Sequence, residues 1–238
     1  MRIRLNDDFL SMFPDASLHL LVCLNAPEFS AGNVKSWKDR ARAVIETSGI
    51  ALEHLSQAPE FQEWRAAYSR FGVKPGKCRS SVEQLWRRAL QGSFVQTPVK
   101  LVDLYCCTSI IARVPMGGYD LDQIVGDLRI RLSEQGERFL AIGEEKPLSV
   151  PKGIVVYVDD ADVVCFAWNH RDSTRTCLRP ETRRVAFFAD SATLESRPRA
   201  VAGLDLIAEA LQESGCEISR ELLDRNHTSV EVTLQCSV

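Results

Sequence analysis

The chain has 238 residues, of which 45% are hydrophobic and 26% are charged, and its formal net charge is −3. This composition is typical of a globular protein that buries a sizeable core, and it excludes collagen-like, low-complexity and highly charged disordered chains. The negative charge argues against indiscriminate nucleic-acid binding, which requires many cations, and we expect no binding to DNA. The chain lacks the apolar runs of a membrane span or signal peptide, so we expect a cytoplasmic protein.

The N-terminal part predicts two strands followed by a helical region. Residues 2–5 and 18–24 have the apolar character of strands, and the polar, proline-containing stretch between them predicts a turn. Beyond it, apolar residues recur at helical spacing as far as Gly72, with Gly49 as an interruption. These residues are Trp37, Ala41, Val44, Ile45, Leu52, Leu55, Phe61, Trp64, Ala67, Tyr68 and Phe71.

A further helix is expected from about residue 81 to residue 90. The sequence Ser80-Ser81-Val82-Glu83 at its beginning matches a capping box, in which the Ser80 hydroxyl would accept from the amide of Glu83. The helix would direct Leu85, Trp86 and Leu90 to the core and leave two cations on the opposite face, Arg87 and Arg88.

From Pro98 onward the pattern favours strands, at residues 99–105, 128–132, 153–158, 163–168 and 185–189. Residues 159–162 predict a hairpin turn, and residues 106–111 are an alternative short helix. A helix at residues 199–212 and a strand at residues 229–234 complete the chain. The pattern predicts one mixed α/β domain of the α+β type over residues 1–238.

The eight cysteines are scattered, and none forms a Cys-x-x-Cys pair or a His/Cys cluster at zinc spacing. We therefore expect reduced thiols and no metal site. Cys106 and Cys107 are adjacent, and the side chains of neighbouring strand residues point apart, which disfavours a disulfide between them. Most of the cysteines are expected in the core.

Cations are concentrated in two segments. Residues 65–88 contain seven cations and one acid, and residues 171–184 contain five cations and two acids. Such patches would seat an RNA backbone. Solvated faces are the alternative, and charge alone favours them. The cations assigned to RNA contact are Lys74, Lys77, Arg79, Arg87, Arg88 and Arg175.

Three polar segments follow apolar runs and are expected to meet in one pocket. They are Val102-Asp103-Leu104-Tyr105, Pro115-Met116-Gly117-Gly118-Tyr119-Asp120 and Trp168-Asn169-His170-Arg171-Asp172-Ser173. Their carboxylates would hold a cationic amino group, their amides and hydroxyls would orient an ester, and their glycines would let the backbone approach a ligand. The alternative is that Asp103 and Asp120 cap turns while Asp172 pairs with Arg171. A shared pocket requires Asp103, Gly118 and Asn169 to line one hollow.

Together these segments resemble the B3/B4 domain, the editing module of the phenylalanyl-tRNA synthetase β subunit, and most closely its freestanding relatives. The similar stretch covers residues 68–190 and includes two further motifs, Phe71-Gly72-Val73-Lys74-Pro75 and Arg79-Ser80-Ser81-Val82-Glu83. The resemblance implies a largely antiparallel sheet flanked by helices, with terminal elaborations around this core. The chain departs from the synthetase domain at Gly117, where that domain has histidine, and from the family at Cys106, where asparagine is usual.

The resemblance implies hydrolysis, in trans, of the ester that links a wrong amino acid to the terminal adenosine of a tRNA, without metal or cofactor. The ester is already activated, so a positioned water and backbone amides suffice, with a ribose hydroxyl as a further aid. The expected catalytic residues are Ser109, Gly117, Gly118, Asn169 and Asp172. The expected substrate-binding residues are Glu83, Asp103, Tyr105, Cys106, Asp120, Trp168 and Arg171.

Several functions stay open. The freestanding relatives include deacylases that remove canavanine from the arginine tRNA, and a pocket rich in aspartate suits that basic side chain better than a phenol. A deacylase for another amino acid such as tyrosine is one alternative. A protein that binds tRNA or a free amino acid without cleavage is another. The third is an esterase in which His170 or His19 activates Cys106.

Overall fold

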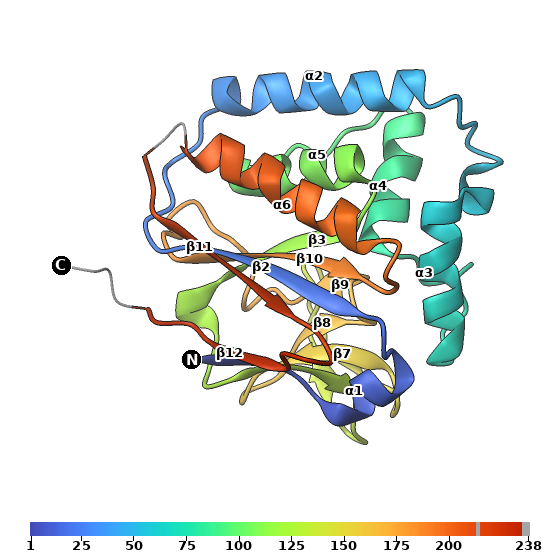
Figure 1. Ribbon diagram of the computed structural model, residues 1–238, viewed down its shortest axis with the longest axis vertical. Helices are drawn as coiled ribbons and strands as arrows, with labels where there is room; N and C mark the ends of the chain where they lie inside the picture. The colour runs from blue at the N-terminus through green and yellow to red at the C-terminus, as the bar shows by residue number, and fades with distance from the viewer. Residues whose placement is uncertain (213–214, 235–238) are drawn as a thin grey trace.

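The computed structural model describes residues 1–212 and 215–234, whose strands form two main sheets (Figure 1). The first has the order β12 (Ser229–Glu231), β1 (Arg2–Leu5), β4 (Leu128–Leu132), β7 (Val155–Val158), β8 (Val163–Phe166) and β9 (Arg171–Asp172). The second has the order β11 (Ile218–Leu223), β2 (Ser17–Cys23), β10 (Val185–Ser191) and β3 (Met116–Asp120). A small hairpin pairs β5 (Arg138–Phe139) with β6 (Leu148–Ser149). Within the described residues the neighbouring strands are antiparallel except for β1 and β4, which confirms the largely antiparallel sheet.

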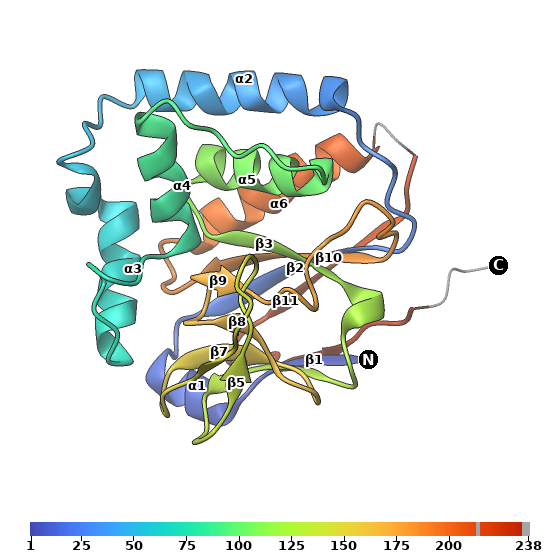
Figure 2. The same cartoon turned by 180° about the vertical axis from the view of Figure 1, so that it is seen from behind.

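Helices cover one face of the second sheet, and the first sheet packs against its other face (Figures 1 and 2). The helices against the second sheet are α5 (Lys100–Ala112) and α6 (Arg197–Gln212), and α2 (Ala31–Thr47) lies over α5. The helices α3 (Pro59–Arg70) and α4 (Ser81–Leu90) stand at one end, and α1 (Asp7–Met12) packs on β4. Because β10 lies between two layers, all seven of its residues are buried.

Local sequence signals account for several elements. The Ser80 hydroxyl accepts from the Glu83 amide at 3.4 Å, so α4 begins where the capping pattern predicts. The predicted hairpin turn at residues 159–162 joins β7 to β8, and the Asp159 carboxylate accepts from the amides of Ala161 and Asp162 at 3.0 Å each. The predicted strands at residues 128–132 and 185–189 are confirmed as β4 and the greater part of β10.

The prediction of a strand at residues 99–105 is wrong, because these residues enter α5. The alternative helix at residues 106–111 is confirmed as its second half. The helix α5 is packed by α2, α4, α6 and β3, so most of its positions are apolar and carry no helical periodicity. An apolar run of this kind does not distinguish a buried helix from a buried strand.

Other local predictions also need correction. Residues 7–12 form α1 where a turn was expected, and residues 116–120, which were not predicted as a strand, form β3. The strand β11 was not predicted, and the last strand ends at Glu231. The cysteines within the described residues are free thiols, as expected, and Cys236 lies outside those residues.

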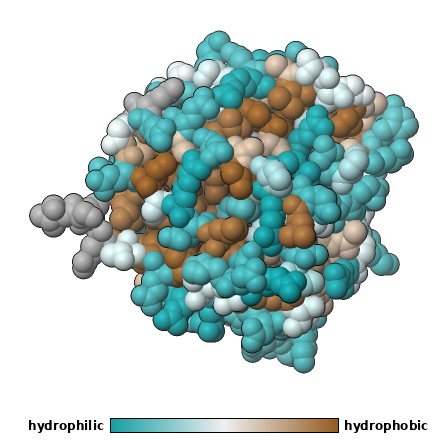
Figure 3. Space-filling model, in the orientation of Figure 1, coloured by the Kyte–Doolittle hydropathy of each residue, from teal (hydrophilic) through white to brown (hydrophobic). Residues whose placement is uncertain are grey.

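The outer face that carries α6 and β11 is mostly hydrophilic, with apolar side chains gathered around α6 and the adjoining strands (Figure 3). Two exposed apolar residues lie on these elements, Val201 on α6 and Leu222 on β11. Within residues 1–212 and 215–234, no helix has both the length and the apolar character that crossing a bilayer requires.

Candidate functional site

A recess lies between the two sheets, where β3, β7, β8 and β10 meet the beginning of α4. We call it the inter-sheet recess. The space not filled by protein atoms is about 340 Å³, with the open solvent at its mouth included. Its lining combines aromatic rings with hydroxyl, amide, imidazole and carboxyl groups, from Ser81, Met116, Gly117, Tyr119, Tyr157, Cys165, Trp168, Asn169, His170, Asp172, Phe188 and Asp190. A small, partly apolar hollow with convergent polar groups is the usual form of a binding site.

A strained turn after β8 brings Asn169 into the inter-sheet recess. Ala167 and Trp168 have φ values of 53° and 64°, in the left-handed region that residues with side chains rarely adopt. The turn sends the Trp168 indole into the core, where ring centroids lie 4.9 Å from Phe9 and 5.0 Å from Trp64. Core packing therefore fixes the backbone from which Asn169 projects.

The Asn169 side chain is held from both ends. Its Oδ1 accepts from the Tyr68 hydroxyl at 3.0 Å, and its Nδ2 donates to Asp190 at 3.2 Å. Its backbone oxygen accepts from the amide of Ser81 at 3.0 Å. The amide group is thus fixed against α3, α4 and β10, which gives the recess a rigid polar wall.

Two carboxyl groups face the inter-sheet recess from different sheets. Asp190 on β10 accepts from the Tyr157 hydroxyl, and Asp172 on β9 accepts from the Tyr119 hydroxyl at 2.8 Å. Burial raises the pKa of Asp190 to about 6, against the opposing effect of its hydrogen bonds. Burial also raises the pKa of Asp172. Both groups therefore gain a proton more readily than an exposed aspartate does.

Ser81 and His170 provide the remaining polar groups of the wall. The Ser81 hydroxyl is buried at the first residue of α4 and has no partner among the described residues. The His170 Nδ1 lies 2.7 Å from the Arg79 carbonyl and 3.2 Å from Nε2 of Gln84. The carbonyl only accepts and is the nearer of the two, so we assign the hydrogen to Nδ1, and Nε2 of the neutral ring is then an acceptor. Burial lowers the pKa of His170, which keeps the ring neutral.

Not all the residues expected in one pocket meet in this recess. Gly117, Trp168, Asn169 and Asp172 line it. The proposition that Asp103, Gly118 and Asn169 share a hollow is wrong. Asp103 is fully buried in the helical layer, where it pairs with Lys38 at 2.8 Å and Lys100 at 3.3 Å.

Asp120 also lies outside the inter-sheet recess. It accepts from the Asp122 amide at 3.0 Å and from the Thr182 hydroxyl at 2.7 Å. The alternative in which Asp103 and Asp120 cap turns is confirmed, because Asp103 accepts from the Thr97 amide and Asp120 accepts from the Asp122 amide. The alternative pairing of Asp172 with Arg171 is not found, because Arg171 is exposed and pairs with Glu144 at 3.1 Å.

Four further candidates lie on the helical side of the second sheet. Gly118 faces that side because alternate strand residues face opposite ways, and Tyr105, Cys106 and Ser109 belong to α5. A Cβ on Gly118 would lie 3.3 Å from the ring of Tyr105 and 3.1 Å from Leu178, which places this face against α5. The Ser109 hydroxyl, within α5, donates to the Val114 carbonyl at 2.6 Å. Cys106 is buried in α5, and burial raises the pKa of its thiol far above the usual range.

Some of the remaining charged candidates form ion pairs within the protein, and the others are exposed. Glu83 is fully buried and pairs with Arg65 at 2.9 Å and Arg79 at 3.4 Å, and Arg175 pairs with Asp159 at 2.7 Å. Glu83, expected to bind substrate, therefore anchors α4 instead. Arg87 is half-buried, whereas Lys74, Lys77 and Arg88 are exposed. Among the described residues, no group of three His, Cys, Asp or Glu side chains is arranged to hold a metal ion.

Sequence analysis did not select several lining residues, including Tyr157, Cys165 and Asp190, and it gave His170 a role only as a possible activator of Cys106. Asp190 offers the clearest missed signal, because it is an acid at the end of the apolar run that begins at Val185. A buried acid of this kind needs partners. Its partners come from distant parts of the chain, so the sequence alone does not identify them.

The B3/4 domain profile matches residues 63–203, more than half of the chain. The chain belongs to the B3/4 domain family. The matched segment contains every residue that lines the inter-sheet recess. A solved structure similar to this family member is an N-terminal fragment of the phenylalanyl-tRNA synthetase β-subunit from Pyrococcus horikoshii, with 11% identity and a TM-score of 0.49. The similarity covers 91% of this chain and 49% of that one, so this chain spans about half of its length. A search of curated proteins gave no match.

Proposed function

We propose that this protein is a trans-editing deacylase, which hydrolyses the ester between a wrong amino acid and the terminal adenosine of a tRNA in the cytoplasm. The family supports a tRNA-related function. The observation that carries the proposal is the polar set of the inter-sheet recess, where Asp172 and Asp190 line the same hollow as the unpartnered Ser81 hydroxyl. An aminoacyl ester carries a cationic ammonium and a carbonyl, which match these two kinds of group.

The carboxyl groups favour a cationic ligand. Their raised pKa values mean that Asp172 and Asp190 ionise at some cost in the empty protein. An ammonium or a basic side chain in the inter-sheet recess would offset that cost, because an opposite charge lowers the pKa of a carboxyl group. Two such groups suit an amino acid with a basic side chain, and we therefore propose canavanine on the arginine tRNA as the substrate, in preference to tyrosine.

The water would be oriented by His170. Its neutral Nε2 accepts a hydrogen bond from water, whose oxygen attacks the ester carbonyl carbon. The developing oxyanion would accept from the Ser81 hydroxyl at the beginning of α4, where the helix dipole favours negative charge. The proton that the water loses passes to His170 Nε2, and His170 returns it to the ribose oxygen when the carbon–oxygen bond to the ribose breaks. Asn169 holds the amino acid, and Gly117 leaves room for it.

Exposed cations lie close to this site along the chain. Lys74 and Lys77 precede Ser81, and the Arg79 carbonyl binds His170 directly. A tRNA acceptor end that enters the inter-sheet recess would pass this segment, where the two lysines would neutralise its phosphates. We propose this loop as one tRNA contact.

A panel of mischarged tRNAs tests the function. We expect wild-type protein to release canavanine from the arginine tRNA on multiple turnover, faster than it releases tyrosine from the phenylalanine tRNA. The change Asp172→Ala should reduce release by at least about tenfold, the effect of one lost hydrogen bond to a charged group. The matched control is Asp39→Ala, since Asp39 is an exposed acid on α2, away from the recess.

Each result of the panel has a defined meaning. Equal rates for the two amino acids, or a faster release of tyrosine, would remove the canavanine assignment and leave the deacylase. Retention of intact aminoacyl-tRNA without release would replace the deacylase with a binding protein.

A further inference from the structure

A second recess lies apart from the inter-sheet recess, at the opposite end of β10. We call it the basic recess. Its space is about 350 Å³, with the open solvent at its mouth included, and it is formed by the connection from β2 to α2, the beginning of α5 and the loop from β9 to β10. These three segments lie side by side in both ribbon views (Figures 1 and 2). The charged residues in its lining are Glu28, Lys100, Arg179 and Arg183, an excess of cations.

Two of the three carboxylates that were expected to bind substrate, Asp103 and Asp120, brace this second recess. Asp103 accepts from the Thr97 amide at 2.8 Å and pairs with Lys100, which fixes the chain where α5 begins. Asp120 accepts from the Thr182 hydroxyl, whose oxygen accepts from the Arg179 amide at 2.9 Å. Both walls are therefore held in place by fully or almost fully buried acids.

The two arginines of the basic recess, unlike its lysine, have no acidic partner in the part of the chain that the structure describes. Arg179 and Arg183 form no ion pair within residues 1–212 and 215–234, and Arg183 donates only to the Pro180 and Thr182 carbonyls. Lys100 shares the single carboxylate of Asp103 with Lys38. Two unpaired guanidinium groups beside a concave surface form a good site for a phosphate, which accepts several hydrogen bonds in a fork geometry.

The beginning of α5 adds to this attraction. Its N-cap residue, Val99, has no capping side chain, and Lys100 and Leu101 are the first two residues of the helix. Their amides have no intrahelical acceptors, so they are free to donate to an anion at the positive end of the helix dipole.

We propose that the basic recess binds a backbone phosphate of the tRNA whose acceptor end occupies the inter-sheet recess. This inference rests on the proposed function for its choice of RNA. The recesses lie at the two ends of β10, and its span from Val185 to Asp190 is about 17 Å at the usual strand rise. A single strand of a few nucleotides would cross that distance along the protein surface.

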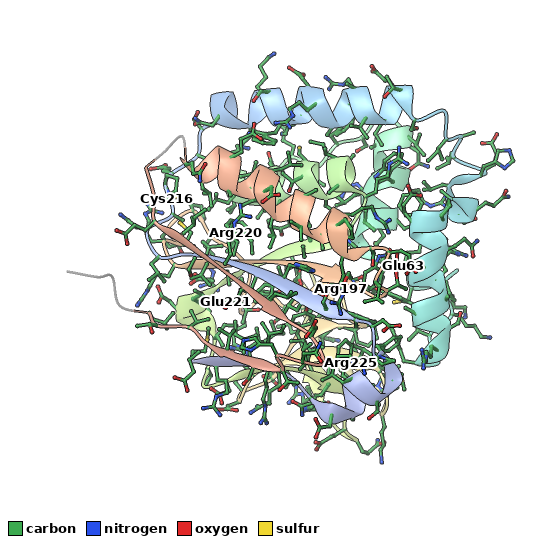
Figure 4. All side chains as sticks on the ribbon, in the orientation of Figure 1. Glu63, Arg197, Cys216, Arg220, Glu221 and Arg225 are labelled. Carbon is green, nitrogen blue, oxygen red and sulfur yellow. The ribbon has the colours of Figure 1, made fainter. Side chains whose placement is uncertain are left out.

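The first experiment uses inorganic phosphate and does not depend on deacylation. Phosphate is titrated into the protein at constant ionic strength while the amide resonances of Lys100, Leu101 and Arg183 are followed. We expect saturable shifts in the wild type and their loss in Arg179→Glu. The matched control is Arg225→Glu, because Arg225 is an exposed arginine in the turn between β11 and β12 (Figure 4).

The second experiment measures the affinity for uncharged tRNA as a function of salt. Arg179→Glu should weaken binding about tenfold and make the slope of log K against log salt less steep by about one, as expected for one lost phosphate contact. Arg225→Glu should leave the slope unchanged. Arg183→Glu provides a second variant of the same recess if Arg179→Glu does not fold.

The outcomes separate the two proposals. If neither phosphate binding nor tRNA binding responds to the arginine variants, the basic recess is not an anion site. If only phosphate binding responds, its ligand is a small phosphorylated molecule and the assignment to RNA fails. If both respond while no mischarged tRNA is hydrolysed, the phosphate site stands and the deacylase is wrong.

Discussion

The Asn169 amide donates to the Asp190 carboxyl group across 3.2 Å and so joins the strained turn after β8 to the central strand β10. The hydrogen bond connects the two sheets at the wall of the inter-sheet recess. Because Tyr68 holds the other end of the amide, Asn169 has a single favourable orientation. The position of the recess wall is thereby linked to the protonation state of the Asp190 carboxyl group.

Asp190 should make the stability of the protein depend on pH. Its pKa is raised from 3.8 to about 6, so its contribution to stability is fully present below about pH 4 and is lost as the pH rises through about 6. Between these values the free energy of unfolding should fall by up to about 3 kcal/mol because of this one group. In Asp190→Asn that fall should disappear, as urea denaturation at several pH values would show. Parallel stability curves for the two proteins would contradict this assignment.

Gly117 and Gly118 should respond oppositely to the same change. A Cβ on Gly117 would have only the Tyr119 hydroxyl within reach, at 4.0 Å, so Gly117→Ala should keep its stability while its methyl group enters the inter-sheet recess. We expect deacylation to fall by about tenfold or more, because the substrate is displaced. Gly118→Ala would meet Leu178 at 3.1 Å and should lose about 1–3 kcal/mol of stability.

Thermal unfolding and the turnover number of the folded protein distinguish the two variants. Gly118→Ala, once folded, should turn over like the wild type. If the fully folded Gly118→Ala protein does not turn over substrate, the active site lies on the helical side of the sheet instead.

Glu83 should be important for folding rather than for substrate binding. Glu83→Ala removes the buried carboxylate with which Arg65 and Arg79 pair and leaves their positive charges without that partner. The change should lower the free energy of unfolding by about 3–5 kcal/mol. The matched exposed pair is Lys35 with Asp39, where Asp39→Ala should cost at most about 1 kcal/mol. Denaturant titration measures both values. A stable Glu83→Ala protein that binds substrate poorly would restore the original assignment.

Cys106 should be dispensable for hydrolysis. It is buried within α5, and the raised pKa keeps its thiol protonated at neutral pH, so it lacks the thiolate that an esterase needs. We expect Cys106→Ala to release the amino acid at a rate within about twofold of the wild type, since Cys106 does not line the inter-sheet recess. Complete loss of activity in a folded Cys106→Ala protein would favour the cysteine esterase.

The sequence by itself determined the mixed α/β class, the helix capped by Ser80, the hairpin turn at residues 159–162 and the family, because each depends on residues close together in the chain or on ordered motifs. Only the tertiary structure decided which polar groups share a hollow. Asp103 and Asp190 both adjoin apolar runs, but one enters a buried helix and the other a central strand. The direction in which each side chain points follows from packing between layers, and the sequence pattern of a fully buried element does not record that packing.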